Sequence, residues 1–141
     1  MLATGRELFT GWNRMPTKHD KGIKGRCDCG RIQYEVAFFP ARVTQCNCSI
    51  CQRYAAVWGY YRRDEVMLTI ADDARASYTC SDKVLEFVHC RHCGCMTHYE
   101  DLEKAPESRV ALNFHMLDDL SWQSLPVRFF ESADRWQEIP G

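Results

Sequence analysis

Nine cysteines in a chain of 141 residues restrict the possible folds more than any other feature of the sequence. Such a content is well above ordinary usage and indicates either disulfide bonds or metal binding. The odd number fits complete disulfide pairing poorly, and residues 1–13 have no basic start followed by a long apolar run. We therefore expect reduced thiols that bind metal in a cytoplasmic protein. A processed, secreted form is the alternative.

Two of the cysteine groups have the spacing of zinc knuckles. One is C-x-C-G at Cys27–Gly30, and the other is C-x-x-C-G at Cys90–Gly94. The glycine lets the backbone turn tightly and direct its amides at the thiolates. Two thiolates from each knuckle complete a tetrahedral site, so we expect a structural zinc ion on Cys27, Cys29, Cys90 and Cys93. The alternative is that these four are reduced core cysteines.

A third group, C-x-C-x-x-C, places Cys46, Cys48 and Cys51 within six residues. Three thiolates leave one coordination position, which catalytic zinc uses for water or substrate. Cys95 is the candidate that would close this site, because it can project from the second knuckle toward a neighbouring ion. A closed site would make the second zinc structural at rest. Reversible disulfide formation by the three cysteines, without metal, is a further alternative.

The remaining cysteine and the histidines carry weaker signals. Cys80 has no partner at metal spacing and is expected to pack as a small apolar side chain. His89 and His92 are expected at the surface or beside the metal ligands. His98 is the candidate for moving protons near an open zinc, since a neutral imidazole does so at physiological pH.

The rest of the chain predicts a single all-β domain. Apolar and polar residues alternate over 32–36 and 110–114, and residues 57–61, 66–70, 85–88, 97–99 and 127–130 are rich in strand-forming residues. A short helix is expected from Ser49 to about Ala56, with Ser49 as its N-cap. We expect the domain at residues 22–131, an N-terminal extension at 1–21 and a C-terminal tail at 132–141.

The charge balance limits the partners. Eighteen basic residues against nineteen acidic residues give a net charge of -1, whereas binding of nucleic acid normally needs a basic excess. No apolar stretch approaches the length of a membrane span. We therefore expect neither nucleic acid nor membrane as a partner, and a homo-oligomer is left open.

The three motifs in this order, each near strands, resemble the family of glutathione-dependent formaldehyde-activating enzymes, which includes centromere protein V. The resemblance covers Gly22 to Asp118, and within this range it includes Asn113 ahead of Leu117. Two departures lie within this region. Tyr54–Val57 lacks the glycine-containing segment often found after the second motif, and His115-Met116 replaces a more basic stretch.

The resemblance implies a β-tent fold with two zinc ions. The structural ion falls on the two knuckles, and the functional ion falls on Cys46, Cys48 and Cys51. It further implies a carbon-sulfur lyase that acts on a small-molecule thiol adduct, with glutathione as substrate or co-substrate and its sulfur approaching the second ion. A non-catalytic, zinc-structured module that binds a protein or chromatin is the alternative.

Glutathione carries two carboxylates, which call for cations in its binding site. Arg53, Arg62 and Arg63 follow the second motif and can supply forked hydrogen bonds to a carboxylate. We take Arg53 as the candidate binding residue. The alternative is that these arginines lie on a solvated strand edge.

Overall fold

The computed structural model describes residues 18–79, 84–131 and 137–139, with side chains described over 22–79 and 84–130. Two sheets make up the described fold. The smaller has three strands in the order β1 (Lys18–Arg26), β2 (Ile32–Phe38) and β5 (Met67–Ile70). The larger has eight, in the order β11 (Gln137–Ile139), β10 (Val127–Glu131), β3 (Val43–Cys46), β4 (Trp58–Arg62), β9 (Arg109–Asn113), β8 (Met96–Asp101), β7 (Leu85–Cys90) and β6 (Arg75–Thr79).

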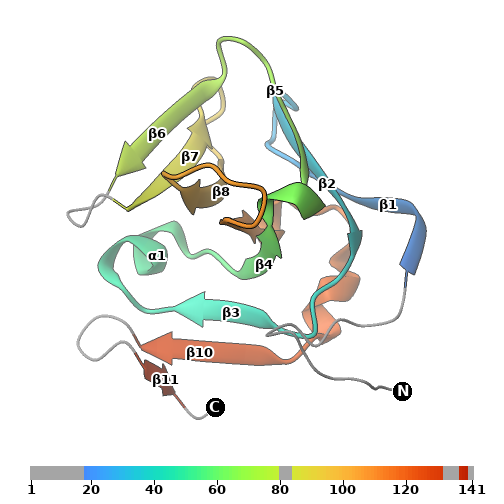
Figure 1. The fold of residues 1–141 in the computed structure, drawn as a ribbon, viewed down its shortest axis with the longest axis vertical. Helices are drawn as coiled ribbons and strands as arrows, with labels where there is room; N and C mark the ends of the chain where they lie inside the picture. Colours follow the sequence, from blue (N-terminus) through green and yellow to red (C-terminus); the bar gives the residue numbers. More distant parts are fainter. Residues whose placement is uncertain (1–17, 80–83, 132–136, 140–141) are drawn as a thin grey trace.

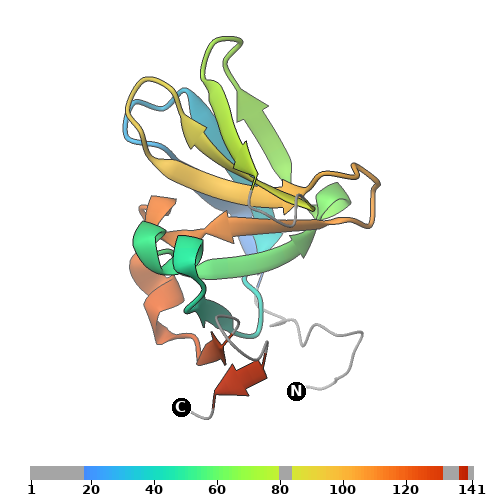
Figure 2. The same ribbon diagram turned by 90° about the vertical axis from the view of Figure 1, so that its left-hand side faces the viewer.

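The two sheets lean together like the slopes of a tent. In Figure 1, β1, β2 and β5 form one slope, β6, β7 and β8 form the other, and β3 and β10 lie along the base. Figure 2 shows the same arrangement from the side. The described strand pairs are antiparallel except β10 with β3, which run parallel. This confirms the predicted all-β fold.

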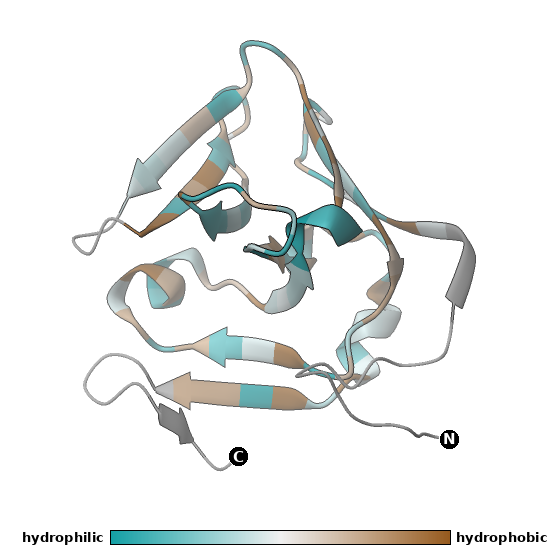
Figure 3. Ribbon diagram, in the orientation of Figure 1, coloured by the Kyte–Doolittle hydropathy of each residue, from teal (hydrophilic) through white to brown (hydrophobic). Residues whose placement is uncertain are grey.

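Alternation of side chains divides the large sheet into two faces with separate cores. Hydrophobic and hydrophilic residues alternate along several strands (Figure 3). On the inner face, Val110 and Leu112 of β9 pack with Tyr34 and Val36 of the small sheet. On the outer face, Trp58 of β4 is fully buried with a second core cluster that includes Phe87, Tyr99 and Ala111. The two faces therefore place neighbouring residues of one strand in different surroundings.

Helix α1 (Ser49–Tyr54) contributes to the outer core. Its Cys51 is buried among the residues of the outer cluster, and Tyr54 packs against Phe87 with ring centroids 6.0 Å apart. The short helices η1 (Arg63–Glu65), η2 (Phe114–Met116) and η3 (Leu120–Ser124) complete the described elements. None of the described helices is long and apolar enough to cross a membrane.

A buried carboxylate, Glu100, lies on the inner face near the C-terminal end of β8 and binds several basic side chains. Arg63 donates to its Oε1 and Arg75 to its Oε2 at 3.2 Å, while His98 Nε2 lies 3.6 Å from Oε2. Burial alone would raise the pKa of Glu100, but the hydrogen bonds and charges of His98 and Arg63 lower it to about 2. The ion pairs therefore compensate the burial of this charge.

The structure adds strands that the sequence pattern does not predict. Strand β1 begins at Lys18, before the expected domain start, and β11 lies within the expected tail. Helix α1 is where it was predicted, but its N-cap is Cys48, whose Sγ accepts the Cys51 N–H, so the assignment of Ser49 as the cap was wrong. The prediction for Cys80 falls outside the described residues.

Candidate metal centres

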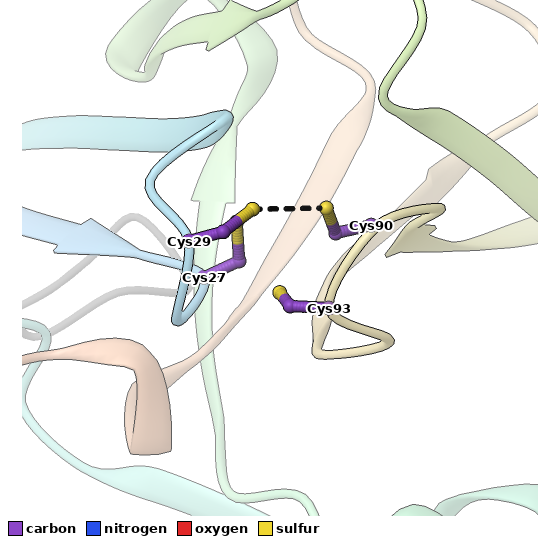
Figure 4. A group of neighbouring side chains, drawn as sticks. All are labelled: Cys27, Cys29, Cys90 and Cys93. Atoms are coloured by element: carbon purple, nitrogen blue, oxygen red, sulfur yellow. Dashed lines mark hydrogen bonds between the residues drawn. The ribbon is translucent and has the colours of Figure 1, made fainter.

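Four thiols from two distant hairpin turns converge between the two sheets. Cys27 and Cys29 follow β1, Cys90 ends β7 and Cys93 follows it; in Figure 4 the two pairs point toward one another. Their Sγ atoms all lie within 4.8 Å of one another, with Cys27 to Cys29 at 3.7 Å and Cys29 to Cys90 at 3.6 Å. A tetrahedral zinc site with Zn–S bonds of ~2.3 Å has sulfur–sulfur edges of about 3.8 Å. The spacing therefore suits a single ion of this size.

The knuckle backbone is arranged as the glycines predict. Gly30 has a φ of 82° and Gly94 a φ of 81°, a region that L side chains rarely adopt. The turns then direct amides at sulfur: the N–H of Ile32 donates to Cys27 Sγ at 3.3 Å, and that of His92 donates to Cys90 Sγ at 3.3 Å. These donors stabilise thiolates over thiols.

The pKa values of Cys27 and Cys93 shift in opposite directions, because the two thiols differ in the hydrogen bonds they accept. Burial raises the pKa of Cys27 to about 11. Burial also raises the pKa of Cys93, but hydrogen bonds from the backbone of Cys29 and Cys95 and from neighbouring thiols outweigh it and bring the pKa to about 6. A divalent cation among the four sulfurs would favour the thiolate at every position. The donor set fits a closed, structural metal site.

The second group lies where β3 runs into α1. Cys46 ends β3, Cys48 caps the helix and Cys51 lies in its first turn, and their Sγ atoms are within 4.8 Å of one another. The N–H of Cys48 donates to Cys46 Sγ, and that of Cys51 donates to Cys48 Sγ, each at 3.5 Å. One short turn of chain therefore gathers all three sulfurs.

The three sulfurs lie so close together that three thiolates would repel one another in the absence of a cation. Hydrogen bonds from Cys46 and Cys48, followed by burial, raise the pKa of Cys51. All eight cysteines in the described part of the chain are free thiols. A group of three close, unbridged sulfurs suits a soft divalent ion, and leaves a fourth position to another ligand.

A pocket of about 290 Å³ opens beside the three thiols. Its lining contains no charged side chain: it is formed by Gln45, Cys46, Asn47, Cys51, Gln52, Ala55, Ala56, Phe129 and Phe130. The parallel pairing of β10 with β3 brings Phe130 opposite Cys46. The sequence does not predict this wall, because nothing in the pattern of residues 127–130 specifies a parallel partner far away in the chain.

Ala55 lines the pocket in a strained conformation. It ends helix α1 with a φ of 53°, the left-handed region that glycine usually occupies at this position. An alanine there costs about 1 kcal/mol relative to glycine. Ala55 lies in Tyr54–Val57, the segment after the second motif that contains no glycine.

Cys95 does not join the second group. Its carbonyl accepts the N–H of Cys90 at 3.0 Å, and its side chain packs in a cluster with Cys27, Ile32 and Val88. It therefore lies against the four-cysteine site, and the described residues supply three cysteines to the other group. The expected closure by Cys95 does not match this placement, because the hairpin turn holds it beside Cys93.

His98 also lies away from the second group. It is 0% exposed and pairs with Leu112 in register, on the inner face of the large sheet. Its Nδ1 hydrogen-bonds Thr97 Oγ1 at 2.8 Å. The next residue, Tyr99, faces the outer cluster that holds Cys51. The expected proton transfer by His98 near the second ion does not match this position, because the strand turns its imidazole to the opposite face.

The three candidate arginines have different surroundings. Arg62 pairs with Asp64 at 2.9 Å, and Arg63 pairs with the buried Glu100. Arg53 is exposed on α1, and its Nη1 donates to the carbonyl and hydroxyl of Ser49. Of the three, Arg53 alone has no carboxylate partner among the described residues.

Comparisons with known proteins identify the class to which a β-tent with these two thiol clusters belongs. The model of the family described as glutathione-dependent formaldehyde-activating enzyme matches residues 22–134. The chain belongs to this family. A crystal structure of a Rhodobacter sphaeroides protein is similar with a TM-score of 0.61 and 23% identity, covering 74% of this chain and 99% of that one, which shows the fold alone. A comparison with curated proteins found no match.

Proposed function

We propose that this protein is a zinc-dependent carbon-sulfur lyase acting on the adduct of an aldehyde with glutathione or a similar small thiol. The observation that carries the proposal is the group of three thiols at the wall of a pocket, to which the described residues supply no fourth cysteine. Membership of the glutathione-dependent formaldehyde-activating family supports the substrate class.

The reaction is the reversible cleavage of a hydroxymethyl thioether. In the cleavage direction the C–S bond breaks and its electron pair remains on sulfur, while the hydroxyl group loses its proton as the aldehyde carbonyl forms. The sulfur then takes up a proton, so the products are a thiol and an aldehyde. When bound to Cys46, Cys48 and Cys51, zinc supplies a soft Lewis acid that stabilises a thiolate at neutral pH.

The residues around the three thiols bind and orient such a substrate. Phe129 and Phe130 give the pocket an apolar wall against which the substrate can pack. The side-chain amides of Gln45, Asn47 and Gln52 can donate to and accept from the peptide groups of a tripeptide thiol. Arg53, at the exposed side of α1, is proposed as a partner for a substrate carboxylate.

Two tyrosines of the outer cluster keep their protons. Tyr99 donates to the hydroxyl of Tyr60 at 3.3 Å, and Ala111 between them on β9 leaves room for this approach. Burial raises the pKa of both phenols. At neutral pH they therefore serve as hydrogen-bond donors and polar packing groups, and not as bases.

The test is a Cys48→Ser variant, assayed for formation and cleavage of the glutathione–formaldehyde adduct. We expect a loss of activity of at least about 100-fold, because a metal ligand is removed, and the loss of one of two zinc ions per chain by elemental analysis. Cys95→Ser is the matched control, since it makes the same chemical change outside the group. Equal activity of Cys48→Ser and the unmodified protein would refute the proposal.

The alternative of a non-catalytic binding module rested on a second site closed by a fourth cysteine and on the resemblance to a family that includes centromere protein V. The described residues place three cysteines in that group, and Cys95 packs elsewhere. We therefore put forward the enzyme alone.

A further inference from the structure

Recognition of an acidic thiol needs positive charge near the three-thiol group, and the arginines that follow it in sequence supply little. Arg62 and Arg63 lie at the opposite end of β4 from Trp58 and are paired with Asp64 and Glu100. The lining of the pocket itself carries no charge. The second strand of the pocket wall, β10, offers another cation, Arg128.

Arg128 is positioned by the parallel pairing of β10 with β3. In this register Arg128 lies opposite Thr44 and Phe130 lies opposite Cys46, so both side chains project from the same face as the metal group. The Arg128 guanidinium lies 5.4 Å from the centroid of the Phe130 ring, and Phe130 lines the pocket with Cys46 and Cys51. The cation is therefore held over the pocket wall by a cation–π contact.

The guanidinium of Arg128 is incompletely satisfied within the described part of the chain. Its Nε atom is buried and has no hydrogen-bond partner there, and no described carboxylate pairs with it. Arg128 as a whole is half-buried, and a buried N–H donor without a partner is costly, so this side of the guanidinium is suited to an acceptor such as a carboxylate.

The charge of the proposed metal group also favours a cation on β10. Three thiolates around a divalent ion have a net charge of -1, and an acidic substrate adds to it, so a nearby cation is needed to make its binding favourable.

We propose that Arg128 binds a carboxylate of the thiol substrate and selects acidic thiols over neutral ones. The inference rests on the proposed function and adds a substrate-positioning residue on β10 to Arg53 on α1. A charge-assisted hydrogen bond of this kind contributes to binding of the acidic thiol and contributes nothing to binding of a neutral thiol.

The experiment compares Arg128→Gln, Arg128→Lys and the unmodified protein, all loaded with zinc. Each is assayed with the formaldehyde adducts of glutathione and of 2-mercaptoethanol, which has no carboxylate. We expect Arg128→Gln to raise KM for the glutathione adduct about tenfold, and Arg128→Lys to restore much of the loss. KM for the 2-mercaptoethanol adduct should change less than about twofold. Arg62→Gln, which removes a surface arginine paired with Asp64, is the matched control.

A binding measurement separates this inference from the proposed function. Calorimetric titration with S-methylglutathione, which keeps both carboxylates and does not react, should show affinity reduced about tenfold in Arg128→Gln at unchanged zinc content. Equal effects on both thiols, no effect on either, or a loss of zinc from the variant would overturn the role of Arg128. If the unmodified protein turns over neither adduct, the proposed function itself fails.

Discussion

The two cysteine clusters contain the same chemical group, yet the chain uses them in different ways. The four-cysteine cluster joins the turn after β1 to the turn after β7, and its Cys27 and Cys90 are fully buried. The three-cysteine cluster is gathered from one short segment beside a pocket. A metal bound by distant segments constrains the whole fold, whereas one bound by a single turn constrains only that turn. With zinc bound at both clusters as proposed, the first ion would tie the two sheets together and the second would hold only its own turn.

The two cysteine clusters also differ in the net charge they would have with a divalent ion bound. Four thiolates around a divalent ion have a net charge of -2, and Arg31 beside Cys29 offsets part of it; a hydrogen bond to Cys29 raises the pKa of that guanidinium. Three thiolates around such an ion would have a lower charge and leave one position open, and neither Arg53 on α1 nor Arg128 on β10 has a carboxylate partner among the described residues. The first site is saturated with protein ligands, and the second is suited to a ligand from outside.

The largest expected effect is on the free energy of unfolding, which should fall much more when a ligand of the four-cysteine cluster is replaced than when one of the three-cysteine cluster is. Cys90→Ser should abolish folding or lower the free energy of unfolding by at least about 5 kcal/mol, which corresponds to at least ~15 °C in Tm, because it unties the two sheets. Cys48→Ser should shift Tm by only a few degrees. Thermal unfolding followed by circular dichroism measures both. Similar melting of the two variants would mean that the clusters do not differ in this way.

The sequence predicted both clusters correctly as groups, because C-x-C and C-x-x-C spacings place sulfurs within one turn of chain. It also predicted β2 and β9, whose alternation is regular, and the all-β class. It did not predict β3 or β6, since four or five residues without alternation give no periodic signal.

The errors concern the N-cap of α1 and the way in which turns and strands pack. Strand alternation allows Cys95 to project toward the second site, whereas the hairpin turn holds it beside Cys93. The sequence does not predict that Arg63 pairs with Glu100. It gives no signal for Arg128, because only the parallel pairing of β10 with β3 brings that strand to Cys46.

An intermediate effect is expected at Glu100, whose ion pairs stabilise the inner face of the large sheet in addition to the four-cysteine cluster. Glu100→Gln should destabilise the protein by about 3 kcal/mol at pH 7, because the pKa of Glu100 is depressed from 4.5 to about 2 by its partners. A depressed pKa contributes stability above the unfolded value and loses it as pH falls. The difference between the two proteins should therefore shrink between pH 4.5 and pH 2. Urea unfolding across this range measures it, and a constant difference would contradict the assignment.

The smallest expected effect concerns Cys95, the residue that the two clusters might have shared. Because it packs beside Cys93 and not in the three-cysteine group, Cys95→Ser should retain two zinc ions per chain and change stability by less than about 1 kcal/mol. Mild chelation should remove one ion first from both the variant and the unmodified protein, at the same rate, since neither has a fourth cysteine on the exposed group. Elemental analysis during chelation follows this loss. Faster release from Cys95→Ser would mean that Cys95 does close the second site in solution, and the contrast between a closed and an open cluster would then be lost.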